Sequence, residues 1–362
     1  MSDETRSIEE QRRAIDEIDD RILELLGARA ERNAAIGKLK ASAATTVWVP
    51  SRELDIVERL ERQNAGLFPT AAIRNVFREI ISASRSLQRS VTVSYLGPQG
   101  TYTHEAAMKR FGHMAEFVPV ATSPEIFECV ESGRCEFGVV PVENSSEGIV
   151  SHTLDLLVDS TLTICAEIHV PIHHDLLVKA GGLRDITAVY SHPQGLAQCR
   201  KWLALNLPNA PQFSAHSTAQ AAERVSREPG GAAIASPVAA EIYGLEVVQS
   251  RIEDSADNTT RFLVIGKTGP APSSRDITSL LFSTRRDEVG TLYRALQPFA
   301  DNGVNLTRIE SRPTKQRAWE YLFFCDFEGN TSEPAVARAI EELRARCDFL
   351  KVLGSYPRAE SV

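Results

Sequence analysis

The sequence predicts a multidomain protein with an all-helical region, an α/β region and an α+β region in that order. Three observations predict this arrangement. Apolar residues recur at helical spacing through the first ninety residues, and at Val91 the pattern changes to short strand-like runs that alternate with helices. Beyond a segment rich in Pro, Gly and Ser, the remaining residues predict two further helices among four strands. We expect domains at residues 1–90, 91–268 and 277–356.

The first region predicts helices only. Between residues 8 and 40 there is no proline, and apolar residues occur at positions 8, 15, 18, 22, 25, 26 and 36. This spacing is typical of a long amphipathic helix. After the helix-breaking stretch TTVWVP, residues 51–64 and 70–89 predict two more helices.

The second region carries the runs VTVSYLG, EFGVVPV, LTICAEIHV, TAVYS, AAIAS and RFLVIG. Their alternation with helical segments implies an α/β domain with largely parallel strands. The stretch KTGPAPSSRD that follows predicts a linker. The order strand, helix, strand, strand, helix, strand after it predicts a ferredoxin-like sandwich.

Composition excludes several classes of function. The 362 residues are 43% hydrophobic and 24% charged, which is ordinary for a soluble globular protein. A net charge of −8 argues against a nucleic-acid or anionic-membrane partner, because both require a basic face. The start, MSDETRSIEEQRR, has no apolar signal-peptide core, and no run of 18 apolar residues occurs, so we expect a cytoplasmic protein.

Metal and nucleotide cofactors are not expected. The six cysteines are scattered without a CxxC pair, which indicates reduced buried thiols instead of disulfides or a zinc site. The eight histidines contain no HExxH motif, and the stretch GPQG is not the GxGxxG of a dinucleotide fold. We therefore predict no cofactor and no metal.

Three cations on the first predicted helix suggest an anion site. Lys40 lies eleven residues beyond Arg29, about 20° around a helix and roughly 16 Å along it, so the two side chains could converge on one small anion. Arg12 lies roughly 25 Å from Arg29 on a straight helix and could join them only across an antiparallel partner helix. Taken alone, a cation of this kind is more often a solvated surface residue than a ligand.

Together with Asp19, the GKLK stretch, the pair Arg52-Glu53 and the late Ser84 and Gln88, this pattern resembles the all-helical chorismate mutase family. The resemblance implies an intertwined dimer of three-helix chains, in which Arg12 reaches into the partner's site. That family's reaction is one pericyclic step, which needs restraint of a reactive conformer and complementary charge. The resemblance implies that Arg12 and Arg29 hold the carboxylates, Lys40 and Gln88 donate to the ether oxygen, Glu53 accepts from the ring hydroxyl, and Arg52 and Ser84 assist. Val49 stands where some members have aspartate, so we expect recognition of the hydroxyl there to be weaker or differently built.

Four motifs in the second region are YLGPQGTYTHEAA, VPVENSSEGIV, YSHPQGLAQC and NTTRF. Individually they also fit a tight turn, a loop after a buried strand, a helix start with Ser191 near the cap, and a strand with a solvated end. In this order and spacing they resemble the prephenate dehydratase family. The resemblance implies two α/β lobes of periplasmic-binding-protein type with the substrate in the cleft between them.

Prephenate loses carbon dioxide and its ring hydroxyl together, so the hydroxyl must be protonated or strongly hydrogen-bonded. The resemblance implies that Thr260 directs its hydroxyl to the leaving oxygen. Arg261 would anchor the pyruvyl carboxylate or brace the site, and Phe262 would supply an apolar wall. Further candidates are Glu143, Asn144 and Ser191 as relays, and Asn144, Ser145, Gln194 and Gln198 for substrate orientation.

The stretch LTRIESRP in the third region resembles the phenylalanine-binding motif of ACT domains attached to prephenate dehydratases, although alone it also fits a strand that ends at Pro313. The second element of that pattern, Gly-Ala-Leu-Val, is here Gly-Thr-Leu-Tyr, with bulkier residues. ACT domains usually pair side by side and bind an amino acid at the seam. The expected effector-binding residues are Gly290, Thr291, Leu292, Glu310, Ser311, Arg312 and Pro313.

These resemblances lead to the hypothesis of a bifunctional chorismate mutase/prephenate dehydratase with phenylalanine feedback, acting as a homodimer or tetramer on small molecules only. One alternative is an amino-acid-sensing binding protein without turnover, which would not require the mutase pattern. A mutase fused to prephenate dehydrogenase would need a nicotinamide site, and no glycine fingerprint is present. Arogenate remains open as the dehydratase substrate.

Overall fold

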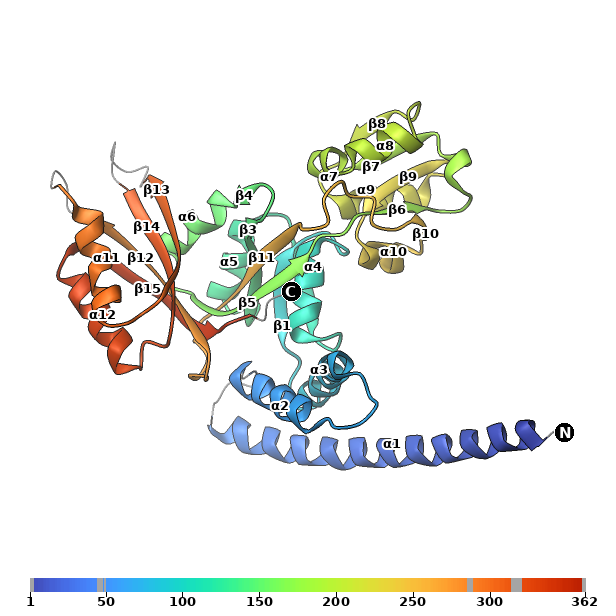
Figure 1. Ribbon diagram of the computed structural model, residues 1–362, viewed down its shortest axis with the longest axis horizontal. Helices are drawn as coiled ribbons and strands as arrows, with labels where there is room; N and C mark the ends of the chain where they lie inside the picture. The colour runs from blue at the N-terminus through green and yellow to red at the C-terminus, as the bar shows by residue number, and fades with distance from the viewer. Residues whose placement is uncertain (1–2, 44–47, 49, 285–288, 314–320, 360–362) are drawn as a thin grey trace. The chain divides into compact units, whose positions relative to one another are not determined.

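The computed structural model describes residues 3–43, 48, 50–284, 289–313 and 321–359 (Figure 1). The chain divides into two compact units. One comprises Met1–Val91 with Phe111–Glu116, and the other comprises Thr92–Arg110 with Phe117–Val362. No helix in the described ranges is long and apolar enough to cross a bilayer.

The first unit contains the helices α1 (Asp3–Ala43), α2 (Pro50–Gln63) and α3 (Thr70–Ser86), which confirms the all-helical prediction. The chain turns into α3 after Pro69, whose extended backbone precedes the first helical turn. Arg74 on α3 makes a two-pronged ion pair with Glu61 on α2, with the shortest N–O distance 2.8 Å. This pair joins the two shorter helices, and α1 packs along α3.

The second unit begins with a sheet that forms the first lobe of the α/β region. Its strands run in the order β2-β1-β3-β11-β5, with β4 paired to β3. The strands are β1 (Thr92–Leu96), β2 (Glu116–Val120), β3 (Phe137–Asn144), β4 (Gly148–Ile149), β5 (Thr163–Pro171) and β11 (Thr259–Gly266). The helices between them are α4 (Tyr102–Phe111), α5 (Ser123–Glu131) and α6 (Ser151–Asp159).

The second lobe is built on a separate sheet with the order β10-β6-β9-β7-β8. Its strands are β6 (Asp175–Val178), β7 (Ala188–Ser191), β8 (Gln212–Ser214), β9 (Gly231–Ala235) and β10 (Glu246–Gln249). Its helices are α7 (Pro193–Gln198), α8 (Arg200–Asn206), α9 (Thr218–Arg227) and α10 (Pro237–Tyr243), with the short 3₁₀ turn η1 (Leu183–Asp185). The two-lobed prediction is therefore confirmed.

The prediction of largely parallel strands is wrong. β1 runs parallel to β3, and β7 runs parallel to β8 and β9, but β11 is antiparallel to both β3 and β5. In the second lobe, β6 is antiparallel to β9 and β10. The reason is the path of the chain. It leaves the first lobe after β5 and returns as β11, which inserts between β3 and β5 in the opposite direction.

The returning strand β11 carries the NTTRF motif, and its register places the site. Thr260 lies opposite Asn144 on β3, and Arg261 lies opposite Glu143. Since successive residues of a strand face opposite sides of the sheet, Thr260 and Phe262 share one face while Arg261 points to the other. The burial of this strand alternates in the same way at its start.

The C-terminal region has the strands β12 (Asp276–Thr284), β13 (Leu306–Pro313), β14 (Tyr321–Glu328) and β15 (Cys347–Pro357) and the helices α11 (Thr291–Asp301) and α12 (Pro334–Arg344). The sheet order is β13-β14-β12-β15, with antiparallel pairing, and both helices lie on one face of it (Figure 1). The ferredoxin-like prediction is confirmed. Its helix-side core includes Phe282, Phe299, Phe327 and Leu343.

The opposite face of this sheet packs on the first lobe. Leu281, Phe324 and Tyr356 belong to the same hydrophobic core as Ile126 and Leu263 of the α/β region. A Cβ on Gly354 would stand 2.4 Å from the carbonyl oxygen of Ile164, so only glycine lets β15 approach β5 this closely. This shared core is why the α/β and C-terminal regions form one compact unit.

Candidate active sites

Arg29 and Ser84 meet where α1 packs on α3. The Arg29 guanidinium donates to the Ser84 hydroxyl and, at 3.3 Å, to the carbonyl oxygen of Ile80. Burial lowers the pKa of the Arg29 guanidinium, and an anion at this position would oppose that effect. The two residues that the mutase resemblance pointed to are thus brought together within one chain.

Gln88 joins the same seam through Asn33, which sequence reasoning missed. The Gln88 Nε2 donates to Asn33 Oδ1 at 3.4 Å, and Asn33 Nδ2 donates to the carbonyl oxygen of Arg29 at 3.0 Å. Asn33 lies one helical turn beyond Arg29, so its spacing could have revealed it. Gly37 lies one turn further, where a Cβ would stand 2.9 Å from the Cγ of Gln88. A glycine here makes room for the glutamine.

Glu53 is already paired within the chain. Its carboxylate accepts from Arg85 Nη1 at 2.5 Å and from Trp48 Nε1 at 3.2 Å. Arg85, which sequence reasoning also missed, is buried and contacts the carbonyl oxygen of Phe111. No sequence signal separates Arg85 from the surface arginines of the same helix.

Arg12 and Arg52 do not reach this seam within one chain. Arg12 is exposed on α1, seventeen residues from Arg29, and Arg52 is exposed on α2. Lys40 belongs to α1, but its side chain and Val49 lie outside the described residues.

The α/β region encloses a cavity of about 520 Å³ lined by both lobes. The first lobe contributes residues from the GPQG turn, from α4, from the end of β3 and from β11. The second lobe contributes the starts of α7 and α9. The polar lining residues used below are Tyr102, Asn144, His174, His192, Gln194, Gln198, His216, Thr218 and Thr260, and Phe262 adds an apolar surface. Within the described lining there is no lysine or arginine.

Asn144 sets the direction of hydrogen bonding at Thr260. Its Oδ1 accepts from the backbone N–H groups of Ser146 and Glu147, at 3.0 and 3.1 Å. Its Nδ2 therefore faces Thr260 Oγ1 and Asn258 Oδ1, each at 2.8 Å. Because the Thr260 oxygen accepts this bond, the hydroxyl keeps its own hydrogen to donate.

Gln198 also presents donors. Its Oε1 accepts from His174 Nε2 at 2.7 Å and from Asn258 Nδ2 at 3.2 Å. Its Nε2 is buried and has no hydrogen-bond partner among the described residues. Gln194 lines the same cavity at the start of α7. His174 and Asn258 were missed by sequence reasoning, although Asn258 begins the quoted NTTRF motif.

Ser191 does not line the cleft cavity. It is fully buried, and its hydroxyl donates to the carbonyl oxygen of Ile234 at 2.7 Å. A Cβ on Gly195 would stand 2.6 Å from the Ser191 Oγ, so α7 packs closely over this serine. The structure therefore gives Ser191 a place beneath the helix start, joining β7 to β9.

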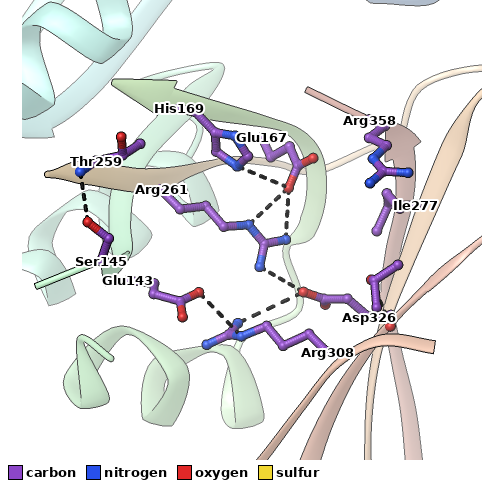
Figure 2. A pocket seen from close by; sticks show the side chains of 11 residues that line it. Glu143, Ser145, Glu167, His169, Thr259, Arg261, Ile277, Arg308, Asp326 and Arg358 are labelled. Atoms are coloured by element: carbon purple, nitrogen blue, oxygen red, sulfur yellow. Dashed lines mark hydrogen bonds and ion pairs between the residues drawn. The ribbon is translucent and has the colours of Figure 1, made fainter. Parts of the chain in front are cut away.

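The Arg261 side chain points toward Glu167 and Asp326 (Figure 2) and does not line the cleft cavity. Its guanidinium donates to Glu167 at 2.9 Å, to Asp326 of β14 at 2.7 Å and to the Tyr356 hydroxyl of β15 at 3.1 Å. Burial opposes the charge, but Tyr356, Asp326 and Glu167 together keep the pKa of Arg261 above its ordinary value. Of the two roles expected for Arg261, this geometry fits bracing, because the alternation of β11 turns its side chain from the substrate side.

The side chains of Glu143 and Ser145 lie on the same side of the sheet as Arg261. They line a second cavity of about 340 Å³ between the first lobe and the C-terminal sheet (Figure 2). Glu143 pairs with Arg308 of β13 at 3.3 Å. The Ser145 hydroxyl accepts from the backbone of Thr259 at 2.9 Å and donates to the backbone of residue 257. The structure does not bring either side chain to the cleft cavity.

The expected effector residues lie at the start of α11 and on β13. Gly290 precedes α11 in the left-handed backbone region, with φ 75°, followed by Thr291 and Leu292. Glu310, Ser311 and Pro313 lie on β13, which is the edge strand of the described sheet. Arg312 instead reaches α6 of the first lobe, where it contacts Ser151 and pairs with Asp155 at 3.0 Å.

Family models match three successive parts of the chain. The model described as chorismate mutase type II matches residues 11–89, the one described as prephenate dehydratase matches residues 93–270, and the ACT domain model matches residues 278–345. Each match falls on one of the three regions described above.

Known proteins resemble the chain over different lengths. A bifunctional chorismate mutase/prephenate dehydratase of Aquifex aeolicus is 46% identical over 97% of this chain and 98% of that protein. The crystal structure of a prephenate dehydratase from Arthrobacter aurescens in complex with L-Phe is 36% identical over 75% of this chain and 92% of that one, with a TM-score of 0.69. GqqA, described as a novel type of quorum quenching acylase, is 31% identical over 74% of this chain and 98% of its own, with a TM-score of 0.68. Of these three, the Aquifex protein spans nearly the whole chain, and the chain therefore belongs to the family of bifunctional chorismate mutase/prephenate dehydratases with a C-terminal ACT domain.

Proposed function

We propose that the helical unit rearranges chorismate to prephenate, that the two-lobed cleft converts prephenate to phenylpyruvate, and that phenylalanine inhibits the second reaction. The observation that carries the dehydratase assignment is the Thr260 hydroxyl, which accepts from Asn144 and keeps a hydrogen for the cavity. A donor in this place is what departure of a ring hydroxyl requires.

In the dehydratase step the bond from the ring to the carboxylate breaks, and its electron pair enters the ring as the carbon–oxygen bond on the opposite carbon breaks. The leaving hydroxide becomes water when it takes up a proton. Thr260 stabilises the developing charge on this oxygen by hydrogen bonding, and Phe262 packs against the ring as it becomes aromatic. Gln198 Nε2 supplies two more N–H donors for a substrate carboxylate.

The absence of arginine and lysine from the described cavity lining suits this reaction. A cation paired with the departing carboxylate would stabilise the charge that must flow into the ring, and it would slow the loss of carbon dioxide. The dianion is instead held by neutral donors and by the start of α9, where Ser217 caps the helix and Thr218 lines the cavity. His192 and His216 are available for the second carboxylate.

At the mutase site, Arg29 and Ser84 hold a carboxylate of chorismate, and Gln88 donates to the ether oxygen. The 3.4 Å bond from Gln88 to Asn33 is long, so the amide can turn toward a substrate. Asn33 then holds the amide near its working position. The Glu53 carboxylate, which Arg85 holds at 2.5 Å, is the acceptor for the ring hydroxyl.

The apolar stripe of α1 supports a second copy of the chain as partner. Eight large apolar side chains of this helix are at least 45% exposed: Ile8, Ile15, Ile18, Ile22, Leu23, Leu25, Ile36 and Leu39. An amphipathic helix normally buries such a stripe, and another α1 running antiparallel would cover it. The same pairing would carry Arg12 into the partner's mutase site, so we propose a homodimer built on this helix.

Phenylalanine control has a direct physical link to the catalytic strands. Arg261 follows Thr260 on β11 and pairs with Asp326 of the ACT sheet. Glu143 precedes Asn144 on β3 and pairs with Arg308 of the same sheet. A shift of the ACT sheet on effector binding therefore moves the two strands that hold Thr260 and Asn144.

The test is an assay without added cofactor on the purified full chain supplied with chorismate. Chorismate loss and phenylpyruvate absorbance in alkali are followed with and without phenylalanine. Phenylpyruvate formed from chorismate and suppressed by phenylalanine supports all three assignments. Prephenate that accumulates without phenylpyruvate contradicts the dehydratase assignment and favours arogenate, and unconsumed chorismate favours an amino-acid sensor.

A further inference from the structure

Two chain segments cross between the two lobes of the α/β region. One leads from β5 to β6 through residues 172–174, and the other leads from β10 to β11 through residues 250–258. The backbone N–H of Ile172 donates to the carbonyl oxygen of Asn258 at 2.7 Å. The backbone N–H of Ile252 donates to the carbonyl oxygen of His174 at 2.8 Å. His174 and Asn258 are 2% and 4% exposed, so their polar groups must find partners inside the protein.

Both side chains use their polar atoms within one continuous chain of hydrogen bonds. The chain begins at the Tyr102 hydroxyl, which lies 2.9 Å from His174 Nδ1. It continues through His174 Nε2 to Gln198, from Asn258 to Gln198, from Asn144 to Asn258, and from Asn144 to Thr260. It therefore links both lobes and both crossing segments to the cleft.

The direction of every bond follows from one end. The backbone N–H groups of Ser146 and Glu147 can only donate, so the oxygen of the Asn144 amide must face them. The Asn144 nitrogen then requires the oxygen of Asn258. Asn258 therefore turns its Nδ2 toward Gln198 and donates to the Gln198 Oε1.

The same logic fixes the histidine tautomer. Since Gln198 offers an oxygen, His174 must carry its hydrogen on Nε2, and a neutral ring then accepts at Nδ1. Burial lowers the pKa of His174, which favours this neutral ring. The Tyr102 hydroxyl supplies the hydrogen and shares it with the carbonyl oxygen of His173 at 2.5 Å. Reversing any one amide would set two donors against each other.

We propose that His174 and Asn258 are positioning residues that hold Gln198 with its amide nitrogen toward the substrate and keep Asn144 turned so that the Thr260 hydroxyl donates. Neither residue has a polar atom left for the substrate, so each acts through its neighbours. The proposal rests on the proposed dehydratase function of this cleft. It predicts that a change at His174 affects substrate binding, because His174 is bonded directly to Gln198 and only indirectly to Thr260.

The first test compares His174→Leu with His174→Gln in the full chain, using prephenate as substrate. His174→Leu removes the donor to Gln198, and we expect KM to rise about tenfold or more while kcat stays within about threefold. His174→Gln can place an amide nitrogen near the position of the ring Nε2, so KM should return to within about threefold of the original. An equal rise of KM in both variants would overturn the proposal. It would mean that the shape of the His174 side chain matters and its N–H donor does not.

The second test uses Asn258→Asp, which changes almost no volume. The new oxygen would face Gln198 Oε1, so the Gln198 amide must turn and offer its oxygen to an anionic substrate. We expect kcat/KM for prephenate to fall about a hundredfold, whereas the same change on a Gln198→Leu background should cost less than about threefold. If Asn258→Asp lowers kcat/KM by the same factor on the Gln198→Leu background as in the parent chain, the proposal is overturned.

Chorismate consumption measured on each variant controls for the amount of active chain, and thermal unfolding of each variant is the folding control for the unit that holds the cleft. A parent chain that consumes chorismate but produces no phenylpyruvate from prephenate would overturn the proposed function itself, before any variant is compared.

Discussion

Asp326 offers a sharp test of how the ACT domain reaches the dehydratase strands. It lies on β14 between two arginines, 2.7 Å from Arg261 Nη1 and 3.9 Å from Arg308 Nη1 (Figure 2). Its other oxygen accepts from Ser279 at 2.5 Å. Asp326→Asn keeps the shape of the side chain and removes the charge that both arginines share.

The magnitude follows from the geometry. The Arg261 and Asp326 side chains are 13% and 11% exposed, so water screens the pair weakly. At an effective dielectric constant of about 20, charges 2.7 Å apart attract by roughly 6 kcal/mol before desolvation is subtracted. Removing one partner of a buried pair commonly costs about 3–5 kcal/mol. Because Arg261 retains Glu167 at 2.9 Å, we expect a loss of about 2–3 kcal/mol in the free energy of unfolding of this unit.

The functional consequence should appear in the inhibition by phenylalanine. Allosteric coupling energies are typically about 1–3 kcal/mol, so losing this link should raise the phenylalanine concentration for half-inhibition several-fold to about a hundredfold. Dehydratase turnover without phenylalanine should change little, since Asp326 does not line the cleft cavity. Mutase activity in the same chain should also be unchanged.

The assay measures prephenate turnover against phenylalanine concentration, with thermal unfolding in parallel. Glu328→Gln is the matched control, because Glu328 lies two residues further on β14 and pairs with Arg358 at 2.6 Å in a half-exposed position. Such a surface pair contributes less than about 1 kcal/mol. A folded Asp326→Asn chain that phenylalanine inhibits as strongly as the parent would show that Asp326 does not transmit the inhibition.

Thr260→Val should lower dehydratase kcat by about a hundredfold or more with KM little changed, because it removes the donor to the leaving oxygen; near-normal turnover would remove Thr260 from the mechanism. Burial raises the pKa of Glu105 from 4.5 to about 7, although Lys109 and His173 oppose the rise, so the unfolding free energy falls as pH rises through this window. Glu105→Gln should therefore stabilise the protein by about 3 kcal/mol at pH 8 and hardly at pH 5, and an equal shift in unfolding midpoint at both values would contradict this. Gly37→Ala should lower mutase kcat/KM about tenfold by pushing Gln88 aside while strengthening α1 by about 0.5–1 kcal/mol, and unchanged mutase kinetics would show that Gln88 can move freely.

The spacing of apolar residues is enough to predict the helices and strands of this chain. The helical spacing along α1 and the change to strand-like runs at Val91 reflect which residues face a core, and this depends only on the local sequence. The same holds for the βαββαβ order of the C-terminal region. The direction of the strands is not local, because it depends on where the chain returns, and β11 returns in the opposite sense.

In the two-lobed region, the sequence motifs pointed to Thr260, Phe262, Asn144, Gln194 and Gln198, which line a common cavity in the structure. They grouped Arg261 and Glu143 with these residues, although the Arg261 and Glu143 side chains point to the ACT sheet. Neighbours on a strand are one residue apart in sequence but face opposite sides of the sheet, and a motif does not show which side holds the ligand.

The three regions, their order and five residues of the cleft lining follow from the amino-acid sequence. Only the folded chain shows that His174 and Asn258 complete one hydrogen-bond chain, and that Asn33 supports Gln88 in the helical unit. These partners lie 24 to 60 residues apart. Hydrogen bonding needs approach to about 3 Å and a matched donor and acceptor, and only the folded path of the chain brings such distant groups together.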